Sequence, residues 1–138
     1  MKRNPALAIG VLATLAAAAL WHDPGGAAAR FTATAERTMR ITLDHYEMPA
    51  VAAKLQRDPL TRTLRFDGPA DGFQRSEILR IGREVPGVAD TAWAGRPGPR
   101  ALPLLAEVML MALASFAIGA VLAYIVALRR RAEEAIYA

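Results

Sequence analysis

An apolar run near the C-terminal end of the chain, residues 102–128, most constrains how this sequence can fold. The run holds one charged residue, Glu107, and is followed at once by Arg129, Arg130 and Arg131. A helix of about 20 mostly apolar residues spans the roughly 30 Å hydrocarbon core of a bilayer. Arginines directly after such a run mark its cytoplasmic flank, because burying cations in lipid is costly. We therefore predict a transmembrane helix here.

The N-terminal end carries a second apolar run, residues 5–21, preceded by Lys2 and Arg3. Its length lies at the lower limit for a membrane span, and Trp21 falls where interfacial aromatic residues anchor spans. A positive start, an apolar stretch and the small residues 26–29 also fit a cleaved secretory signal. Both interpretations stay open, and we favour an uncleaved anchor.

The positive residues at the two ends predict the orientation of the chain. They flank the outer side of each apolar run, which places both termini in the cytoplasm and the middle of the chain outside it. Alanine is abundant and the chain has 15 Arg to 2 Lys, which suggests a GC-rich bacterial genome. We therefore expect a protein of the bacterial inner membrane with a periplasmic middle domain.

The net charge of +4 comes mostly from the two ends of the chain. Between residues 21 and 101 there are 12 basic and 10 acidic residues, so this region lacks the strongly basic character typical of nucleic-acid-binding domains. No nucleic-acid partner is expected. Cysteine is absent, which excludes disulfides and thiolate metal sites.

The first half of the middle region predicts a helix followed by a β-hairpin. Four residues at helical spacing share one face of the predicted helix: Ala35, Met39, Leu43 and Tyr46. Residues 51–56 and 62–67 alternate between apolar and polar side chains, as half-buried strands do, with Leu64 and Phe66 facing inward. Asp58-Pro59 between these strands predicts a turn.

The second half of the middle region predicts a helix and a third strand. Asp71 and Gln74 have the spacing of a capping box, in which each side chain accepts from the other residue's backbone N–H. The helix is expected to run through Glu84 and to end at Pro86-Gly87. Four residues lie on one side of this predicted helix: Gln74, Ile78, Ile81 and Val85. A short strand over 88–93 completes an α+β fold: a small α-β-β-α-β periplasmic domain between two transmembrane helices.

This middle region resembles a BON domain, a small α/β module of bacterial envelope proteins. The resemblance covers residues 33–94 and depends on the strand 62–68 that ends in glycine, the helix 73–84 and the Val-Pro-Gly-Val turn 85–88. It implies binding to phospholipid surfaces or envelope partners. The chain departs from many members of that family in carrying one such unit and an additional span, and it has no peptidoglycan-binding domain.

Few side chains are available for catalysis or metal binding. His45 lies beside Asp44 and Glu47, but neighbours at these spacings do not point the same way on a helix. His22 lies at the edge of the first apolar run, where we interpret it as an interfacial polar residue and not a pigment ligand. We expect no enzyme, no metal and no cofactor.

Three sets of residues are candidates for contacts with partners. The second apolar run carries a stripe of small residues: Ala112, Ser115, Gly119 and Ala123. Such a stripe would let another helix approach closely, either the first apolar helix or a helix of a partner. Alanine-rich spans also produce such stripes by chance. Glu107 either extends to the membrane interface or contacts a cation of a partner. Four arginines are candidates for anionic lipid headgroups: Arg62, Arg65, Arg75 and Arg80.

The predicted organisation has six segments. They are an N-terminal transmembrane helix or signal anchor (1–21), a linker (22–32), the BON-like domain (33–94), a Pro/Gly linker (95–101), a transmembrane helix (102–128) and a cytoplasmic tail (129–138). We expect a non-enzymatic adaptor or accessory subunit that binds membrane lipid and another integral membrane protein or complex. The alternatives are an accessory subunit of a photosynthetic or respiratory complex and a phospholipid-binding factor of envelope maintenance.

Overall fold

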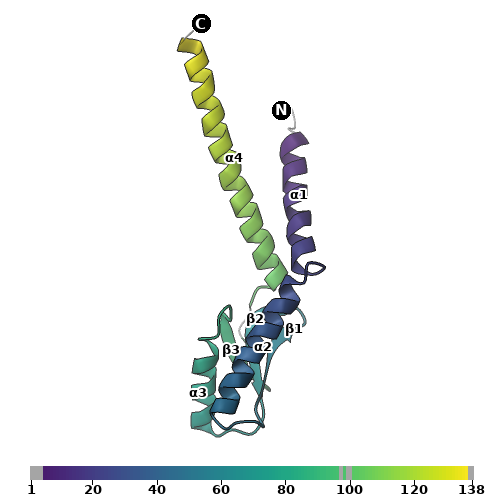
Figure 1. The fold of residues 1–138 in the computed structure, drawn as a ribbon, viewed down its shortest axis with the longest axis vertical. Helices are drawn as coiled ribbons and strands as arrows, with labels where there is room; N and C mark the ends of the chain where they lie inside the picture. The colour runs from purple at the N-terminus through teal and green to yellow at the C-terminus, as the bar shows by residue number, and fades with distance from the viewer. Residues whose placement is uncertain (1–4, 97, 99–100, 137–138) are drawn as a thin grey trace.

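The computed structural model describes residues 5–96, 98 and 101–136 (Figure 1). Seven elements follow one another: α1 (Pro5–His22), α2 (Ala27–His45), β1 (Ala52–Arg57), β2 (Leu60–Asp67), α3 (Gly72–Gly82), β3 (Asp90–Trp93) and α4 (Leu104–Ile136). The predicted α+β class is confirmed, and α1 and α4 are both long and apolar enough to cross a membrane. Lys2 and Arg3, whose charges predict topology, lie outside the described residues, as do three residues of the 95–101 linker.

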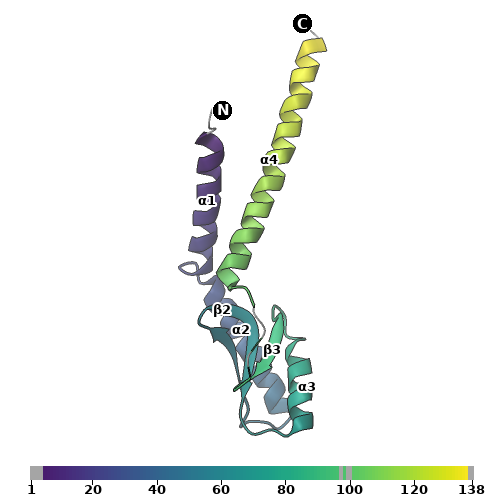
Figure 2. The ribbon, with the colours of Figure 1, turned by 180° about the vertical axis from the view of Figure 1, so that it is seen from behind.

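The middle elements form a small α/β domain, and α1 and α4 both leave it from the same end (Figures 1 and 2). The sheet has the strand order β1-β2-β3; β1 pairs antiparallel with β2, and β2 pairs parallel with β3. Because β2 and β3 are parallel, the chain must cross over between them, and α3 makes that crossover. Helices α2 and α3 both contribute side chains to one core against the sheet.

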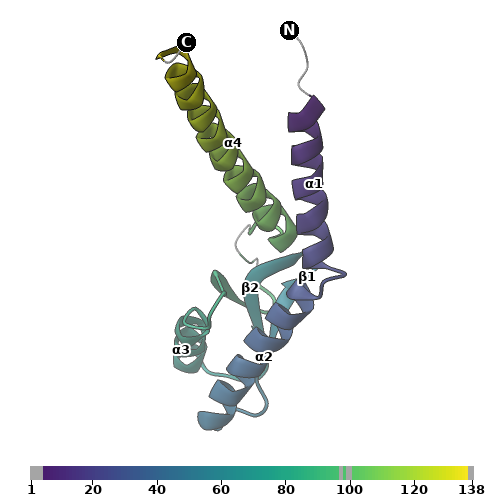
Figure 3. The same cartoon turned by 45° about the horizontal axis from the view of Figure 1, so that its top comes forward.

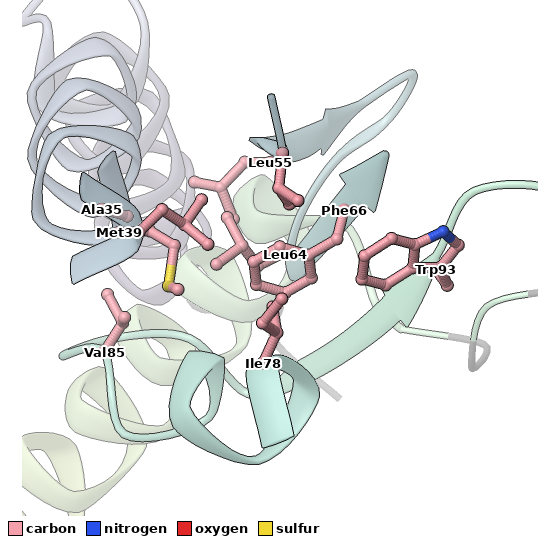
Figure 4. Close-up of a cluster of buried hydrophobic side chains, with 10 residues drawn as sticks. Ala35, Met39, Leu55, Leu64, Phe66, Ile78, Val85 and Trp93 are labelled. Atoms are coloured by element: carbon pink, nitrogen blue, oxygen red, sulfur yellow. The ribbon is translucent and has the colours of Figure 1, made fainter. Parts of the chain in front are cut away.

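The hydrophobic core lies between the two helices and one face of the sheet (Figure 4). Leu64 and Phe66 of β2 are completely buried at its centre, as the alternation of that strand predicts. From α2, the predicted face contributes its first three members: Ala35, Met39 and Leu43. Phe66 also stacks on Trp93 of β3, with ring centroids 6.1 Å apart. The packing of apolar side chains against β2 therefore joins all of the domain's elements.

Helix α2 also covers the free edge of β1. Glu36 Oε1 accepts from the backbone N–H of Leu55 at 3.0 Å, and both carboxylate oxygens of Glu36 accept from Arg57 Nη2 at 3.1 Å. Arg40 Nη1 donates to the carbonyl of Val51 at 2.8 Å. Unpaired groups of an edge strand invite pairing with other chains, so these side chains reduce that exposure.

The capping box at the start of α3 is confirmed in both directions. The Gln74 backbone N–H donates to Asp71 Oδ1 at 2.7 Å, and the Asp71 backbone N–H donates to Gln74 Oε1 at 2.9 Å. Of the four residues predicted to share one side of this helix, Gln74 is exposed. Ile78 and Val85 are buried and Ile81 is partly buried, as predicted.

Several element boundaries differ from those that the sequence predicts. Helix α2 begins at Ala27, inside the predicted linker, because alanine has the highest helix propensity and the break after α1 is confined to residues 23–26. Tyr46 is exposed at the C-terminal end of α2 and not part of its buried face. Helix α3 ends at Gly82, two residues before Glu84, and β3 begins at Asp90.

Two glycines of α3 are expected to respond oppositely to substitution by alanine. A Cβ at Gly82 would lie 2.8 Å from Phe66 Cζ and 2.9 Å from Thr91 Cγ2, whereas a Cβ at Gly72 has nothing within 4 Å. We expect Gly82→Ala to lower the free energy of unfolding by about 1–3 kcal/mol through overpacking. Gly72→Ala is expected to leave it unchanged or raise it by up to about 1 kcal/mol. Thermal unfolding of the full chain in dodecyl maltoside measures both, and equal effects would contradict this packing.

Candidate functional site

The two apolar helices pack side by side where they leave the domain and extend away from it in the same direction (Figure 3). Helix α1 has 18 residues and α4 has 33, which correspond to lengths of about 27 Å and 50 Å at 1.5 Å per residue. Arg129, Arg130 and Arg131 lie within α4, so the helix continues beyond its apolar part. The described ends of both helices therefore lie on the same side, away from the domain.

The close approach of α1 to α4 occurs at Gly10. A Cβ at Gly10 would lie 2.8 Å from the ring of Phe116, so the absence of a side chain creates the space that this ring occupies. Small residues let neighbouring helices approach closely in this way. The sequence does not single out Gly10, because α1 contains many small residues and only the facing Phe116 distinguishes this one.

The predicted stripe of small residues in α4 mostly faces away from α1. Ser115, Gly119 and Ala123 are exposed, and a Cβ at Gly119 would meet nothing within 4 Å. Ser115 Oγ donates to the carbonyl of Met111 at 2.9 Å, within its own helix. Ala112 is half-buried. The three exposed members are therefore not used for packing against α1.

An ion pair connects the sheet to the base of α4. Arg62 Nε of β2 lies 2.7 Å from Glu107 Oε2 in the first turn of α4. The side chain of Arg62 is 37 % exposed and that of Glu107 is 20 % exposed, so the pair is partly shielded from water. The N–H direction does not meet hydrogen-bond geometry, and Arg62 Nε is buried without another acceptor, so the contact is electrostatic. The structure thus brings together two residues for which the sequence predicts separate external partners.

The other three arginines considered for lipid contact also have partners within the chain. Arg65 Nη2 donates to the carbonyl of Arg96 at 3.3 Å, and the guanidinium of Arg75 lies 5.1 Å from the centroid of the Trp93 ring. Arg80 forms ion pairs with Glu77 and Glu84. The hydrogen bond from Arg80 lowers the pKa of Glu77 below its ordinary value, because it stabilises the charged carboxylate. These contacts do not gather the four arginines into one patch.

A pocket of about 480 Å³ lies at the junction where α1, β2 and α4 meet. Its apolar lining includes Leu20, Leu60 and Leu105, with His22 and Asp23 beside them. His22 Nε2 is buried and has no hydrogen-bond partner within the described part of the chain. In residues 5–96, 98 and 101–136 there is no group of three or more His, Asp or Glu side chains placed to hold a metal ion.

The chain matches no family model, no curated protein and no solved structure. The resemblance to a BON domain therefore remains a prediction from the residues that carry it.

The Arg62–Glu107 pair is expected to stabilise the junction between the domain and α4. In a double-mutant cycle with Arg62→Gln and Glu107→Gln, we expect a coupling energy of about 1 kcal/mol, because the pair is only partly shielded from water. Thermal unfolding of the full chain in dodecyl maltoside at low salt measures it. The more exposed Arg80–Glu84 pair is the matched control and should show weaker coupling. Equal coupling energies for the two pairs would contradict the prediction that Arg62–Glu107 stabilises the junction more than an ordinary surface pair does.

Proposed function

We propose that this chain is a non-enzymatic protein of the bacterial inner membrane whose exported domain binds a partner. In this proposal α1 and α4 both span the membrane, both termini are cytoplasmic and the α/β domain is periplasmic. The protein acts as an adaptor or accessory subunit, and α4 contacts another integral membrane protein or complex.

The observation that carries this proposal is the departure of both apolar helices from one end of the domain. Such an arrangement allows both helices to enter the same bilayer while the domain stays outside it. The Arg62–Glu107 pair and the packing of Phe116 against Gly10 restrict how the domain and helices move relative to each other. A domain held in this way presents its opposite end to partners at a set distance from the membrane.

The likeness of the domain to a BON unit is part of the proposal. It is supported by the Val-Pro-Gly-Val turn, in which Gly87 adopts φ +86°, a conformation that favours glycine. A Cβ there would lie 2.5 Å from the ring of Phe31. The turn therefore needs glycine for both its backbone conformation and its packing, which gives this short motif a structural reason.

The topology and the association are tested on the tagged full chain in its native membrane. Because the chain has no cysteine, single cysteines at Asp58 and Ala132 report their side of the membrane without background. We expect a membrane-impermeant maleimide to label position 58 from the periplasm and position 132 only after lysis. Purification in a gentle detergent should recover one complex at fixed stoichiometry, with intact mass showing whether residues 1–21 are retained. Release of the chain by alkaline extraction, or its recovery alone, would contradict the proposal.

A second candidate function, phospholipid binding, is favoured by a pair of cations on the sheet. Lys54 stands directly opposite Arg65 in the β1–β2 register, on the sheet face away from Leu64. Like charges in this position repel each other. No carboxylate of the described residues lies within 4 Å of either cation, although Asp58 lines the same pocket of about 570 Å³. The hairpin turn beside this pocket lies near the bases of α1 and α4, within reach of a bilayer surface.

Removal of this cation pair is expected to weaken binding of anionic lipid. We expect Lys54→Gln with Arg65→Gln to reduce retention of dioctanoyl phosphatidylglycerol on the full chain about tenfold or more, since each surface cation contributes about 1 kcal/mol. Native mass spectrometry from detergent measures the retention, with dioctanoyl phosphatidylcholine as the neutral lipid. Arg37→Gln with Arg83→Gln removes the same charge elsewhere and should change little. If both double variants lost the same amount of bound phosphatidylglycerol, the effect would come from net charge alone and would contradict a lipid site at Lys54 and Arg65.

A further inference from the structure

The end of the domain farthest from α1 and α4 carries an apolar groove between the C-terminal end of α2 and α3. Its volume is about 260 Å³, and we call it the distal groove; its lining includes Tyr46, Met48, Phe73, Glu77, Ile78 and Ile81. The volume suits one or two side chains and is small for an extended ligand. The groove therefore has the size of a pocket for anchor residues of another protein.

Two aromatic side chains at this groove are exposed without a structural reason. Phe73 is 78 % exposed, and Tyr46 is 56 % exposed. Phe73 follows the capping box and contributes nothing to it, since Asp71 and Gln74 make both of its hydrogen bonds. Exposed aromatic residues beside an apolar pocket are typical of protein-binding surfaces, where aromatic side chains contribute much of the binding energy.

Glu47 at the edge of this groove occupies a position that normally favours glycine. Its φ is +55°, and the bonds from Glu47 N to Asp44 O and from Met48 N to Leu43 O form a Schellman motif that ends α2. A left-handed conformation is unfavourable for a residue with a Cβ, and an anion at a helix C-terminus opposes the helix dipole. In the described part of the chain, no basic side chain forms an ion pair with Glu47. The left-handed conformation of Glu47 and its negative charge at the C-terminus of α2 are therefore both unfavourable, and no ion pair of the described residues compensates for them.

The charged residues around the groove are mostly acidic. Asp44, Glu47, Glu77 and Glu84 carry four negative charges. Arg40, which pairs with Asp44 and donates to the carbonyl of Met48, and Arg80, which pairs with Glu77 and Glu84, carry two positive charges. Acidic edges attract a basic partner and repel an acidic one. A second copy of this chain would present the same acidic edges, and an anionic membrane surface would also be repelled. The position opposite the apolar helices further separates this groove from the bilayer.

We propose that the distal groove binds an apolar side chain of another exported protein, flanked in that protein by lysine or arginine. The apolar side chain inserts between Phe73, Tyr46 and Ile81, and the flanking cation pairs with Glu47. This inference deepens the proposed function by naming the binding surface and the chemistry of the partner, and it rests on the periplasmic location of the domain.

Synthetic peptides test this proposal on the full chain in dodecyl maltoside at low salt. The probes are fluorescein-labelled helical peptides with one leucine face, made in three versions: lysine flanks, glutamate flanks, and lysine flanks with the leucines replaced by serine. Fluorescence anisotropy gives the affinities. We expect the lysine-flanked leucine peptide to bind at least about tenfold more tightly than either of the other two. Equal affinity of the lysine- and glutamate-flanked leucine peptides would overturn the proposal.

Variants locate the peptide on the protein. We expect Phe73→Ser to weaken binding about tenfold and Glu47→Gln about threefold to fivefold, with 0.5 M NaCl removing the effect of Glu47. Ile41→Ser is the matched control, because Ile41 of α2 is also a largely exposed apolar residue, at 65 %, and lies outside the groove lining. Unchanged binding by Phe73→Ser, with thermal unfolding confirming that it is folded, would overturn the proposal.

Two other outcomes separate this inference from its alternatives. Concentration-dependent self-association that Phe73→Ser abolishes would assign the groove to a second copy of the chain and overturn the proposal. The peptide measurement does not depend on where the protein lies in the cell. Failure of the maleimide topology therefore contradicts the proposed function and the exported location of the partner, but not the binding chemistry of the groove, whereas failure of peptide binding in a correctly inserted protein contradicts only the groove assignment.

Discussion

Strand β2 holds this structure together, because it pairs with a strand on each side and also contacts the apolar helix α4. Its backbone bonds to β1 and β3, its completely buried Leu64 and Phe66 form the centre of the core, and its Arg62 pairs with Glu107 of α4. A strand with neighbours on both edges leaves few unpaired backbone groups. A shift of β2 by one residue would move its apolar side chains to the other face and break every one of these contacts.

The two ends of the domain differ in chemistry as well as in position. The end near the apolar helices carries the Arg62–Glu107 pair and a pocket lined by Leu60 and Leu105. The far end carries exposed aromatic residues with acidic edges.

Local patterns predict most of the domain, and contacts between distant segments account for what they miss. Asp71 and Gln74 lie three residues apart, and the alternation around Leu64 is equally local, so both can be recognised in the sequence. The pairing of Arg62 with Glu107 spans 45 positions and depends on how α4 returns to the sheet, which no local pattern encodes. The sequence places the start of α2 too late, because the alanines at 27–29 are interpreted as small residues of a linker. Alanine is also the strongest helix former, and in the structure these residues begin the helix.

The unequal lengths of the apolar helices decide which surfaces remain for a partner. Helix α1 is much shorter than α4, and within the part of the chain that the structure describes every residue of α4 from 121 to 130 is exposed. Ser115 and Gly119 are exposed as well, on a side that α1 leaves free where Phe116 packs against Gly10. Lipid satisfies apolar side chains without preference for one face, because its acyl chains are as apolar as leucine. A partner helix would be distinguished from lipid by its fit to the small residues. The exposed part of α4 and the distal groove lie at opposite ends of the molecule, so the two surfaces are far enough apart to bind different partners.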